Sequence, residues 1–465
     1  MCAFPAAALA QVPPPPQPVP NGPPAVLRER PQAIYTGSIP QGQPGAPIDL
    51  SLREAIRRGL QFNLGVLTNR DLADSARIER RQALSTLLPN VSAGAVQTSQ
   101  QIDLVAFGLS VPGFPAIVGP FGYENLRAYV QQTVYDRPSR MNLKSLDESR
   151  KAAEFTADDA RNLVVQAVSN AYLAIITEAA RAQAIQAEVD LAQALYDRAV
   201  DQKNAGTVPG IDVLRANVQL KVEQQQLVAQ KNQVEKAKLT LARAIGLPGG
   251  QSFNVTDTLP YAPLETALDS LLQQAHQHRN DMRAAEANVR AAELAVESAK
   301  AEHYWPQVVV EGDYGDIGKT LFTSSHGTYS VLAGVRVPIY AGGRAKADTD
   351  QAEITLRTMK NALDDLRGRV DYEVRNAVLD LESAAQQVTV ARDNVDLANQ
   401  TLLQARDRFS AGVTDNIEVV QAQQLLAQAN ENYIGSLNAH NAAKIALAAA
   451  LGIAEDGVPQ YLGLK

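Results

Sequence analysis

The chain has 465 residues, of which only 5% are aromatic, and its formal net charge is −7 at pH 7. This charge and the lack of a basic tract argue against nucleic acid as a partner. The only cysteine is Cys2, which excludes an intramolecular disulfide framework and a CxxC metal or redox motif. No run of 18 apolar residues occurs, so a membrane-spanning part would have to consist of β-strands.

The first ten residues resemble the end of a secretory signal peptide. Ala8-Leu9-Ala10 forms an A-x-A cleavage pattern, although no charged segment precedes it. We expect residues 1–10 to be a signal-peptide remnant, with an ordinary N-terminal segment as the alternative. Residues 11–47 are rich in Pro, Gly and Gln, a composition typical of an extended tether.

A first structural repeat is predicted over residues 48–248. Helical periodicity begins at residue 48, where Asp49 or Ser51 can cap the helix, and it stops at Pro89. The period then changes to the alternation of a strand, with a loop rich in Gly, Pro and aromatic residues in the middle. Two strands are predicted here, at about 91–105 and 126–135.

The second half of this repeat is a helical hairpin. Nothing interrupts the helical pattern from about residue 142 to 203, a length that spans roughly 90 Å. The chain turns at a tip, residues 204–214, and returns as a helix that ends at Ile245. Residues 249–263 contain two glycines and two prolines and are predicted to be a linker.

A second structural repeat, residues 264–454, follows the same order. A helix runs to about residue 303 and stops before Pro306, and strands are predicted at about 307–314 and 329–339. A helix of about 65 residues then leads to Phe409 and a tip at 410–420. Residues 455–465 form the C-terminal tail.

The two repeats are related by one constant offset. Four pairs of landmark residues lie 206 positions apart: Gly206 and Gly412, Asp212 and Glu418, Ala216 and Ala422, and Gly246 and Gly452. A constant offset indicates an internal duplication. Glycine at each tip fits the left-handed position just past a helix end, so the sequence predicts two long helical hairpins.

Each repeat contributes two strands, which gives four strands per chain. Their alternation and the tyrosines beside them are typical of a membrane-spanning barrel with aromatic girdles, although a small soluble sheet is the alternative. Four strands cannot close a barrel, and lipid does not tolerate an open sheet edge. If the strands span a membrane, several chains must therefore share one barrel.

Residues 48–454 resemble the TolC family of bacterial outer-membrane efflux channels. The resemblance is specific because several modest motifs occur in order and in duplicate. They are Leu50-Ser-Leu-Arg-Glu-Ala-Ile56, the joints Leu88-Pro89 and Trp305-Pro306, Ile339-Tyr-Ala-Gly-Gly-Arg344, and the hairpin ends Ile245-Gly-Leu247 and Leu451-Gly-Ile453.

The resemblance implies a mixed α/β membrane protein that is mainly helical and duplicated internally. Long antiparallel helical hairpins would form an α-barrel that continues a shared transmembrane β-barrel, with four strands from each chain of a homotrimer. The trimer would be a passive duct from periplasm to exterior in an efflux or type I secretion system. Its partners would be a periplasmic adaptor protein, an inner-membrane transporter and outer-membrane lipid.

The resemblance also implies a constriction at the periplasmic end. The positions that match the family's inward-pointing acidic residues are Glu418 and Gln421, so one carboxylate ring is kept and one is replaced by amides. Three carboxylates in a narrow throat attract cations and repel anions. The alternative is that Glu418 serves only as the capping-box partner of Asp415 at the start of its helix.

The positions that match the family's polar latch are Asp212, Phe409 and Thr414. Only Asp212 keeps its residue type, because Phe409 has no hydroxyl and Thr414 has no charge. We therefore expect a latch that is weaker or built on apolar contact, with Arg408 as a candidate substitute. The positions that match the family's adaptor-docking turns are Gly206, Thr207, Val208, Gly412 and Val413, and both valines are expected to be exposed.

Catalysis and metal binding find little support in the sequence. His276 and His278 are two residues apart, so a helix places them on different faces. No GxSxG or similar motif frames a nucleophile, and we expect no enzyme activity and no cofactor. A soluble periplasmic coiled-coil scaffold or adaptor is the alternative function, although two hairpins at a fixed offset argue against it.

Overall fold

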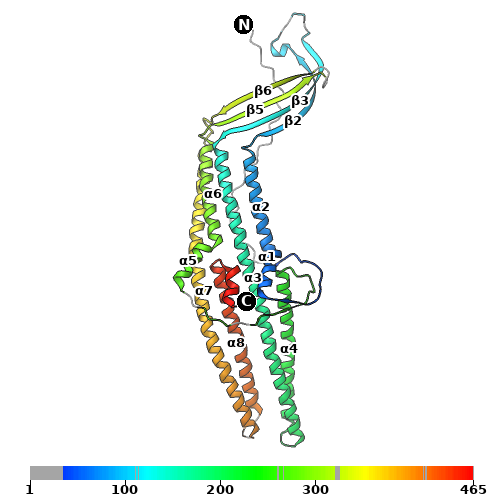
Figure 1. Ribbon diagram of the computed structural model, residues 1–465, viewed down its shortest axis with the longest axis vertical. Coiled ribbons are helices and arrows are strands. Elements are labelled where there is room, and N and C mark those ends of the chain that lie inside the picture. Colours follow the sequence, from blue (N-terminus) through cyan, green and yellow to red (C-terminus); the bar gives the residue numbers. More distant parts are fainter. Residues whose placement is uncertain are drawn as a thin grey trace.

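The structure is a computed structural model that describes residues 35–109, 112–113, 115–258, 261–264, 267–319, 325–411, 413 and 416–463. The molecule is long and thin, with a four-stranded sheet at one end and two helical tips at the other (Figure 1). The predicted signal remnant, residues 1–10, and the first part of the predicted tether lie outside the described residues.

The helical segment predicted after residue 48 is divided into three elements. They are β1 (Ile48–Leu50), α1 (Leu52–Phe62) and α2 (Leu64–Ser85). Ser51 is confirmed as a cap, because its side chain accepts a hydrogen bond from the Glu54 N–H at 3.3 Å. The break comes at Asn63, whose side chain accepts a hydrogen bond from the Gly65 N–H at 2.8 Å and so caps α2.

The first hairpin consists of α3 (Arg137–Asn204) and α4 (Gly210–Ala244). With 68 residues, α3 is roughly 100 Å long. It begins five residues before the predicted start, because Asp136 accepts a hydrogen bond from the Ser139 N–H at 3.3 Å and Pro138 fits the first turn.

The linker, the second repeat and the C-terminal tail each differ from the prediction. The linker contains a strand, β4 (Phe253–Val255), which pairs in parallel with β1. The helix predicted from residue 264 is divided at Arg279 into α5 (Leu268–His278) and α6 (Asn280–Glu302). The C-terminal tail contains α9 (Ala454–Leu462), because Ala454, Val458 and Leu462 bury one face of a helix. The second hairpin consists of α7 (Arg344–Ser410) and α8 (Asn416–Ala450).

The four long strands form one antiparallel sheet in the order β2-β3-β5-β6. They are β2 (Asn90–Asp103), β3 (Ile117–Asp136), β5 (Gln307–Gly318) and β6 (Ser325–Arg336), and a short 3₁₀ turn, η2 (Val105–Phe107), follows β2. β3 starts nine residues before the predicted strand, because residues 117–125 pair with β2 despite their glycines and proline. β6 ends before Pro338, which cannot donate a ladder hydrogen bond.

The four long strands and the long helices form a single layer with a corresponding lateral order from the sheet to the tips. Beside the sheet, α2 packs on α3, α3 on α6 and α6 on α7. Towards the tips the order is α4, α3, α8 and α7, and α4 and α7 lie at the two sides of the molecule (Figure 1). The layer therefore has one side made of β2, α2 and α4, and another made of β6 and α7.

The largest core lies where the two repeats meet midway along the layer. Tyr172 of α3 is almost fully buried there, and its hydroxyl donates to the Leu50 carbonyl at 3.0 Å and to Asp257 of the linker at 2.5 Å. Lys444 of α8 is completely buried and donates to two backbone carbonyls, those of Ala262 and Tyr461. These buried polar contacts attach the linker and α9 to the helical layer.

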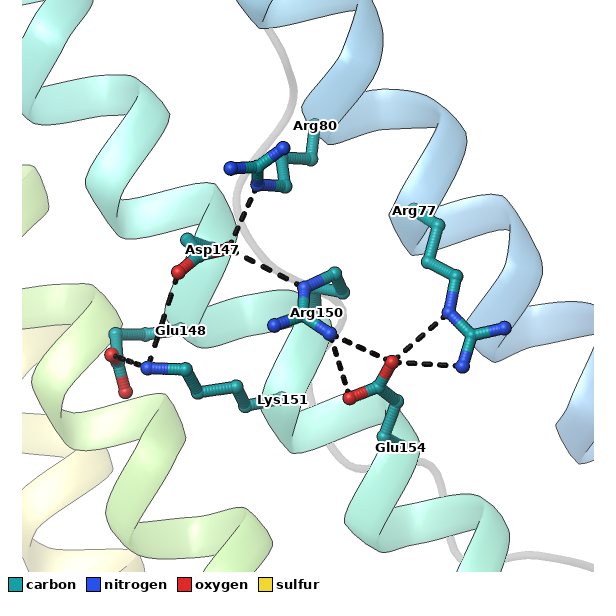
Figure 2. Close-up of polar contacts among 7 residues, drawn as sticks. All are labelled: Arg77, Arg80, Asp147, Glu148, Arg150, Lys151 and Glu154. Atoms are coloured by element: carbon teal, nitrogen blue, oxygen red, sulfur yellow. Dashed lines mark hydrogen bonds and ion pairs between the residues drawn. The ribbon is translucent and has the colours of Figure 1, made fainter.

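A network of charged side chains joins the upper helices (Figure 2). Arg80 of α2 lies 2.8 Å from Asp147 of α3, and Arg77 lies 2.9 Å from Glu154. Arg150 bridges the two acidic residues within α3. Linked ion pairs of this kind stabilise packing more than isolated surface pairs do, so the network holds α2 against α3 close to the sheet.

One helix, α3, contains an 18-residue window that is apolar enough to cross a membrane, with a mean hydropathy of 1.4. Half of that window is buried inside the protein. Because the buried residues Val164, Val168 and Ile175 belong to the central core, this core accounts for the apolar character of α3.

Candidate functional site

The two faces of the sheet differ in polarity. Directly paired residues share a face of an antiparallel sheet. Val130 pairs with Val91 and Gly312, and Gly312 pairs with Val331, so these residues form one apolar face. This apolar face is exposed, since Val91, Val331 and Val335 are each about 70% accessible. An exposed apolar sheet face of this size indicates contact with lipid or another chain.

The opposite face carries a polar network. Arg127 of β3 forms an ion pair with Asp313 of β5 and donates to the Thr328 hydroxyl of β6 at 2.7 Å. Gln131 donates to Glu311 at 3.0 Å in the same manner. These side chains satisfy one another across three strands, and Glu311 leaves the group with one net negative charge. The sheet therefore has one face suited to lipid and one suited to water.

The predicted tip residues come from the ends of both hairpins. Gly206 has a φ of 75°, the left-handed conformation that favours glycine, and the Thr207 N–H bonds to the Gln202 carbonyl at 2.9 Å. Val413 is 68% exposed, as expected. Val208 is half-buried, so the prediction that it is exposed is wrong. Gly412, Thr414 and Asp415 lie outside the described residues.

Val208 is half-buried because the two tips touch there. A small cavity between the tips of the two hairpins is lined by Val208, Asp212 and Phe409, together with Leu195, Arg198, Ala199 and Gln202 of α3. Phe409 also packs on the apolar cluster of α7 and α8 that contains Leu402 and Val419. The structure thus places two of the three predicted latch positions, Asp212 and Phe409, around one small cavity, and Phe409 makes apolar contacts beside it.

Glu418 lies in the first turn of α8, and its carboxylate points toward α7 of the same hairpin. Its Oε1 lies 3.7 Å from Nε of Arg408, and both side chains are well exposed. Arg408 therefore approaches Glu418, while Asp212 lies 3.5 Å from Arg215 of its own helix. An exposed ion pair of this length contributes little stability, which leaves the charge of Glu418 available at the tip.

Gln421 lines an apolar groove between the starts of α4 and α8. The groove has a volume of about 380 Å³ and is lined by Ile211, Leu214, Arg215, Val218, Gln219, Ile417, Val420 and Gln421. This groove is absent from the predictions made from the sequence. The signal was present, because Ile211 and Ile417, and likewise Leu214 and Val420, are separated by the same 206 residues as the tip glycines. Equivalent faces of the two repeats thus form its walls.

A polar cavity of about 380 Å³ lies higher up, where α3, α4 and α8 meet. Its charged lining residues are Arg181 and Glu188 of α3, Glu223 of α4 and Glu431 of α8. Arg181 lies 2.8 Å from Glu431, but Oε2 of Glu223 is buried without a hydrogen-bond partner. Burial, and then the charges of Glu223 and Glu431, raise the pKa of Glu188 to about 7.

The two histidines considered as metal ligands have separate partners. His276 Nε2 lies 2.8 Å from Oδ1 of Asp371, and His278 Nδ1 lies 3.0 Å from the Gln274 carbonyl oxygen of its own helix. Each imidazole is therefore oriented by a different group.

Comparison with known proteins agrees with this architecture. Residues 70–247 and 271–453 match the family model of the "Outer membrane efflux protein" family. The chain is 23% identical over 434 residues to the toluene efflux pump outer membrane protein TtgF of Pseudomonas putida, an alignment that covers 88% of this chain and 85% of the relative.

Solved structures show the same fold. The CmeC outer membrane channel of Campylobacter jejuni matches with a TM-score of 0.76 at 15% identity, covering 94% of both chains. The outer membrane protein VceC of Vibrio cholerae matches with a TM-score of 0.73 at 19% identity, covering 86% of this chain and 96% of that one. The family match includes both helical hairpins and both pairs of strands. The chain therefore belongs to the outer membrane efflux protein family, whose members are TolC-like channels of the outer membrane that extend through the periplasm.

Proposed function

We propose that three copies of this chain close into a passive duct from the periplasm to the exterior. The observation that carries the proposal is the single layer with two open sides. Among the described residues, β2 and β6 are edge strands of the sheet, with β3 and β5 as their respective partners. A membrane-embedded edge must be paired, so β6 of one copy would pair with β2 of the next and give twelve strands.

The helices support the same closure. Since α4 and α7 lie at opposite sides of the layer (Figure 1), the α7 side of one copy would meet the α4 side of the next copy below the barrel. The polar sheet face with Arg127 and Asp313 would line the water-filled lumen, and the face with Val130 and Val335 would contact outer-membrane lipid. Residues 48–248 and 264–454 would be equivalent structural repeats joined by the linker 249–263.

We assign the duct to an efflux pump with a periplasmic adaptor and an inner-membrane transporter. Several relatives are named as outer membrane components of efflux pumps, and one is the toluene efflux pump protein TtgF. The groove of Ile211, Leu214 and Ile417 lies beside the tips, where an adaptor would reach the duct. Its apolar lining suits an amphipathic helix of that adaptor, with the tip residues Gly206, Thr207, Val208, Gly412 and Val413 beside it.

The periplasmic end would be the gate of the duct. Glu418 and Gln421 would form its constriction, and Asp212, Phe409 and Thr414 would hold the tips together. The apolar contact of Phe409 with the first tip supports a latch that does not depend on polar bonds alone.

The test is the molar mass and conductance of the purified protein. Light scattering in detergent should give three chain masses per particle, and the same preparation should form channels in planar bilayers. A monomer that inserts and conducts would contradict the proposal. A soluble periplasmic scaffold, the alternative, would remain in solution without detergent, a behaviour for which the exposed apolar sheet face offers no explanation.

A further inference from the structure

A group of two arginines and two aromatic residues lies where the first long helix meets the sheet. The Arg137 guanidinium carbon lies 4.2 Å from the centre of the Trp305 ring, and that of Arg140 lies 5.5 Å from the centre of the Tyr135 ring. The two rings are themselves 6.4 Å apart. Stacking on a ring holds a guanidinium in place while its N–H groups remain available for other partners.

This group lies at the border of the apolar sheet face. Tyr135 pairs with Val308, and Val308 pairs with Val335, so Tyr135 shares the face that would contact lipid. Nearby segments expose further apolar and aromatic side chains, since Tyr340 is 89% exposed and Tyr304 is 75% exposed. Aromatic side chains at the end of an apolar barrel face mark the level of lipid headgroups.

The carboxylate closest in sequence to the two arginines is that of Asp136, which is used as the N-cap of α3 and accepts hydrogen bonds from Ser139. Neither arginine forms an ion pair within the described part of the chain; Arg140 donates one N–H to the Val134 carbonyl at 3.2 Å. Two other arginines near the sheet are paired, Arg127 with Asp313 and Arg344 with Asp348.

The start of α3 offers room for a further anion. Asp136 caps the helix, but the first turn beyond this cap contains no acidic residue, and the positive end of the helix dipole repels the two arginines there. An anion beside the arginines would remove this repulsion and would interact favourably with both charges and with the dipole.

We propose that Arg137 and Arg140 bind the phosphate headgroups of phospholipids in the membrane leaflet that faces the helical part of the protein. The inference rests on the proposed function, because it takes the sheet as the membrane-spanning part. Lipid is the occupant that fits both halves of the surface, since its acyl chains match the apolar sheet face and its phosphate matches the guanidinium pair. The rings of Tyr135 and Trp305 would lie at the level of the headgroups and orient the arginines.

The test compares three proteins by native mass spectrometry during titration with dioleoyl phosphatidylglycerol. They are the wild type, Arg137→Gln/Arg140→Gln, and the charge-matched control Arg53→Gln/Arg70→Gln on α1 and α2. Removal of a basic residue from a membrane surface weakens binding of anionic lipid about fivefold. We therefore expect lipid binding to fall by roughly fivefold for each of Arg137 and Arg140, and to stay at the wild-type level in the control.

Unchanged lipid binding in Arg137→Gln/Arg140→Gln, or an equal fall in the control, would overturn the proposal. So would displacement of the lipid by millimolar inorganic phosphate, which would indicate a site for free anions. Arg137→Lys/Arg140→Lys should bind at an intermediate level, because lysine keeps the charge but loses the planar, stacked geometry. The same spectra report the number of chains in each particle. A monomeric wild type would contradict the proposed trimer, whereas a trimer that binds lipid equally well in all variants would contradict only the lipid site.

Discussion

At the scale of single residues, the tip combines a charged group with an apolar contact. Glu418 and Arg408 are 3.7 Å apart and exposed, whereas Phe409 is half-buried against the first hairpin. An exposed ion pair contributes about 0–1 kcal/mol to the free energy of unfolding, and a buried aromatic ring contributes several times more. Phe409 should therefore hold the tips together, and Glu418 should act mainly through its electric field.

Glu418→Gln should weaken the preference of the channel for cations. In a trimer the change removes three charges from the narrowest region at once, while the loss of the pair with Arg408 costs little stability. The measurement is the reversal potential of single channels in a salt gradient. Glu235→Gln, which removes an exposed charge from the middle of α4, is the control. Unchanged selectivity in Glu418→Gln would place the carboxylate outside the conducting path.

Phe409→Ala should raise the open fraction of the channel. A fully buried Phe→Ala change costs about 3–5 kcal/mol, and roughly half of that is expected for a half-buried ring. Single-channel recordings check the result, with Leu403→Ala, an exposed position on the same helix, as the matched control. If both variants open equally often, the contact of Phe409 with the first tip does not hold the gate.

At the scale of helices and strands, two of the contacts between the repeats lead to separate predictions. The cavity between α3, α4 and α8 places Glu188 and Glu223 of the first hairpin beside Glu431 of the second. The antiparallel pairing of β3 with β5 joins the two β-hairpins into one sheet with a defined apolar face. The first contact predicts a pH-dependent stability, and the second predicts which face of the sheet enters the membrane.

The packing of the two hairpins should weaken as the pH rises from about 4.5 to about 7. The pKa of Glu188 is raised to about 7 in the folded protein, so the folded state binds the proton more tightly than the unfolded state. The stabilisation that results from this tighter proton binding is fully present below the pKa that Glu188 has in the unfolded state. It is lost as the carboxyl ionises in the folded protein.

Glu188→Gln should therefore be more stable than the wild type at pH 8 and equal to it at pH 4.5. The gain at pH 8 should be about 1–2 kcal/mol, less than the full pKa difference implies because the carboxyl is partly solvated. Melting temperatures at the two pH values check this, with Glu235→Gln as the control. A stability difference that does not change with pH would refute the role of ionisation at Glu188.

Arginine on the apolar sheet face should impair membrane insertion. Val130→Arg or Val335→Arg should cost about 2–4 kcal/mol if the site lies near the membrane midplane. Gln131→Arg is the matched control, because Gln131 is adjacent to Val130 and points to the polar face beside Glu311. Assembly is followed by the yield of heat-modifiable protein in the membrane fraction. Normal assembly of both valine variants would show that this face does not contact lipid.

At the scale of the whole molecule, the chain is an open layer whose two sides remain exposed from the sheet to the tips. Helices α4 and α7 carry apolar side chains in contact with solvent, among them Val228 and Val390. Val228 lies 22 residues after Gly206 and Val390 lies 22 residues before Gly412. In a closed ring these two residues would lie at about the same height on neighbouring copies.

Val228→Cys/Val390→Cys should therefore cross-link between chains. Since Cys2 is the only natural cysteine, a short bis-maleimide in a Cys2→Ser background would act only on the new pair. A ladder that ends at three chains on a denaturing gel is expected, and the single variants should give no covalent trimer. A ladder that ends at two chains, or cross-linking within one chain, would contradict the closed trimer.

The features that repeat along the chain are predictable from the amino-acid sequence. The helical period, the strand alternation and the 206-residue offset are local patterns, so they predicted two long hairpins, two pairs of strands and the family resemblance. Local pattern was insufficient at Asn63 and Arg279, where a helix ends because of contacts with distant segments. The Asn63 amide, for example, donates to the carbonyls of Tyr35 and Ala244.

How the two repeats face each other depends on contacts that form in the folded chain. The half-buried position of Val208, the approach of Arg408 to Glu418 and the groove between α4 and α8 all depend on how one hairpin is rotated against the other. The same is true of Glu188, whose two acidic neighbours are 35 and 243 residues away in sequence. Periodicity gives the face of each helix but not its partner, because the partner is chosen by the sum of many weak contacts across the whole layer.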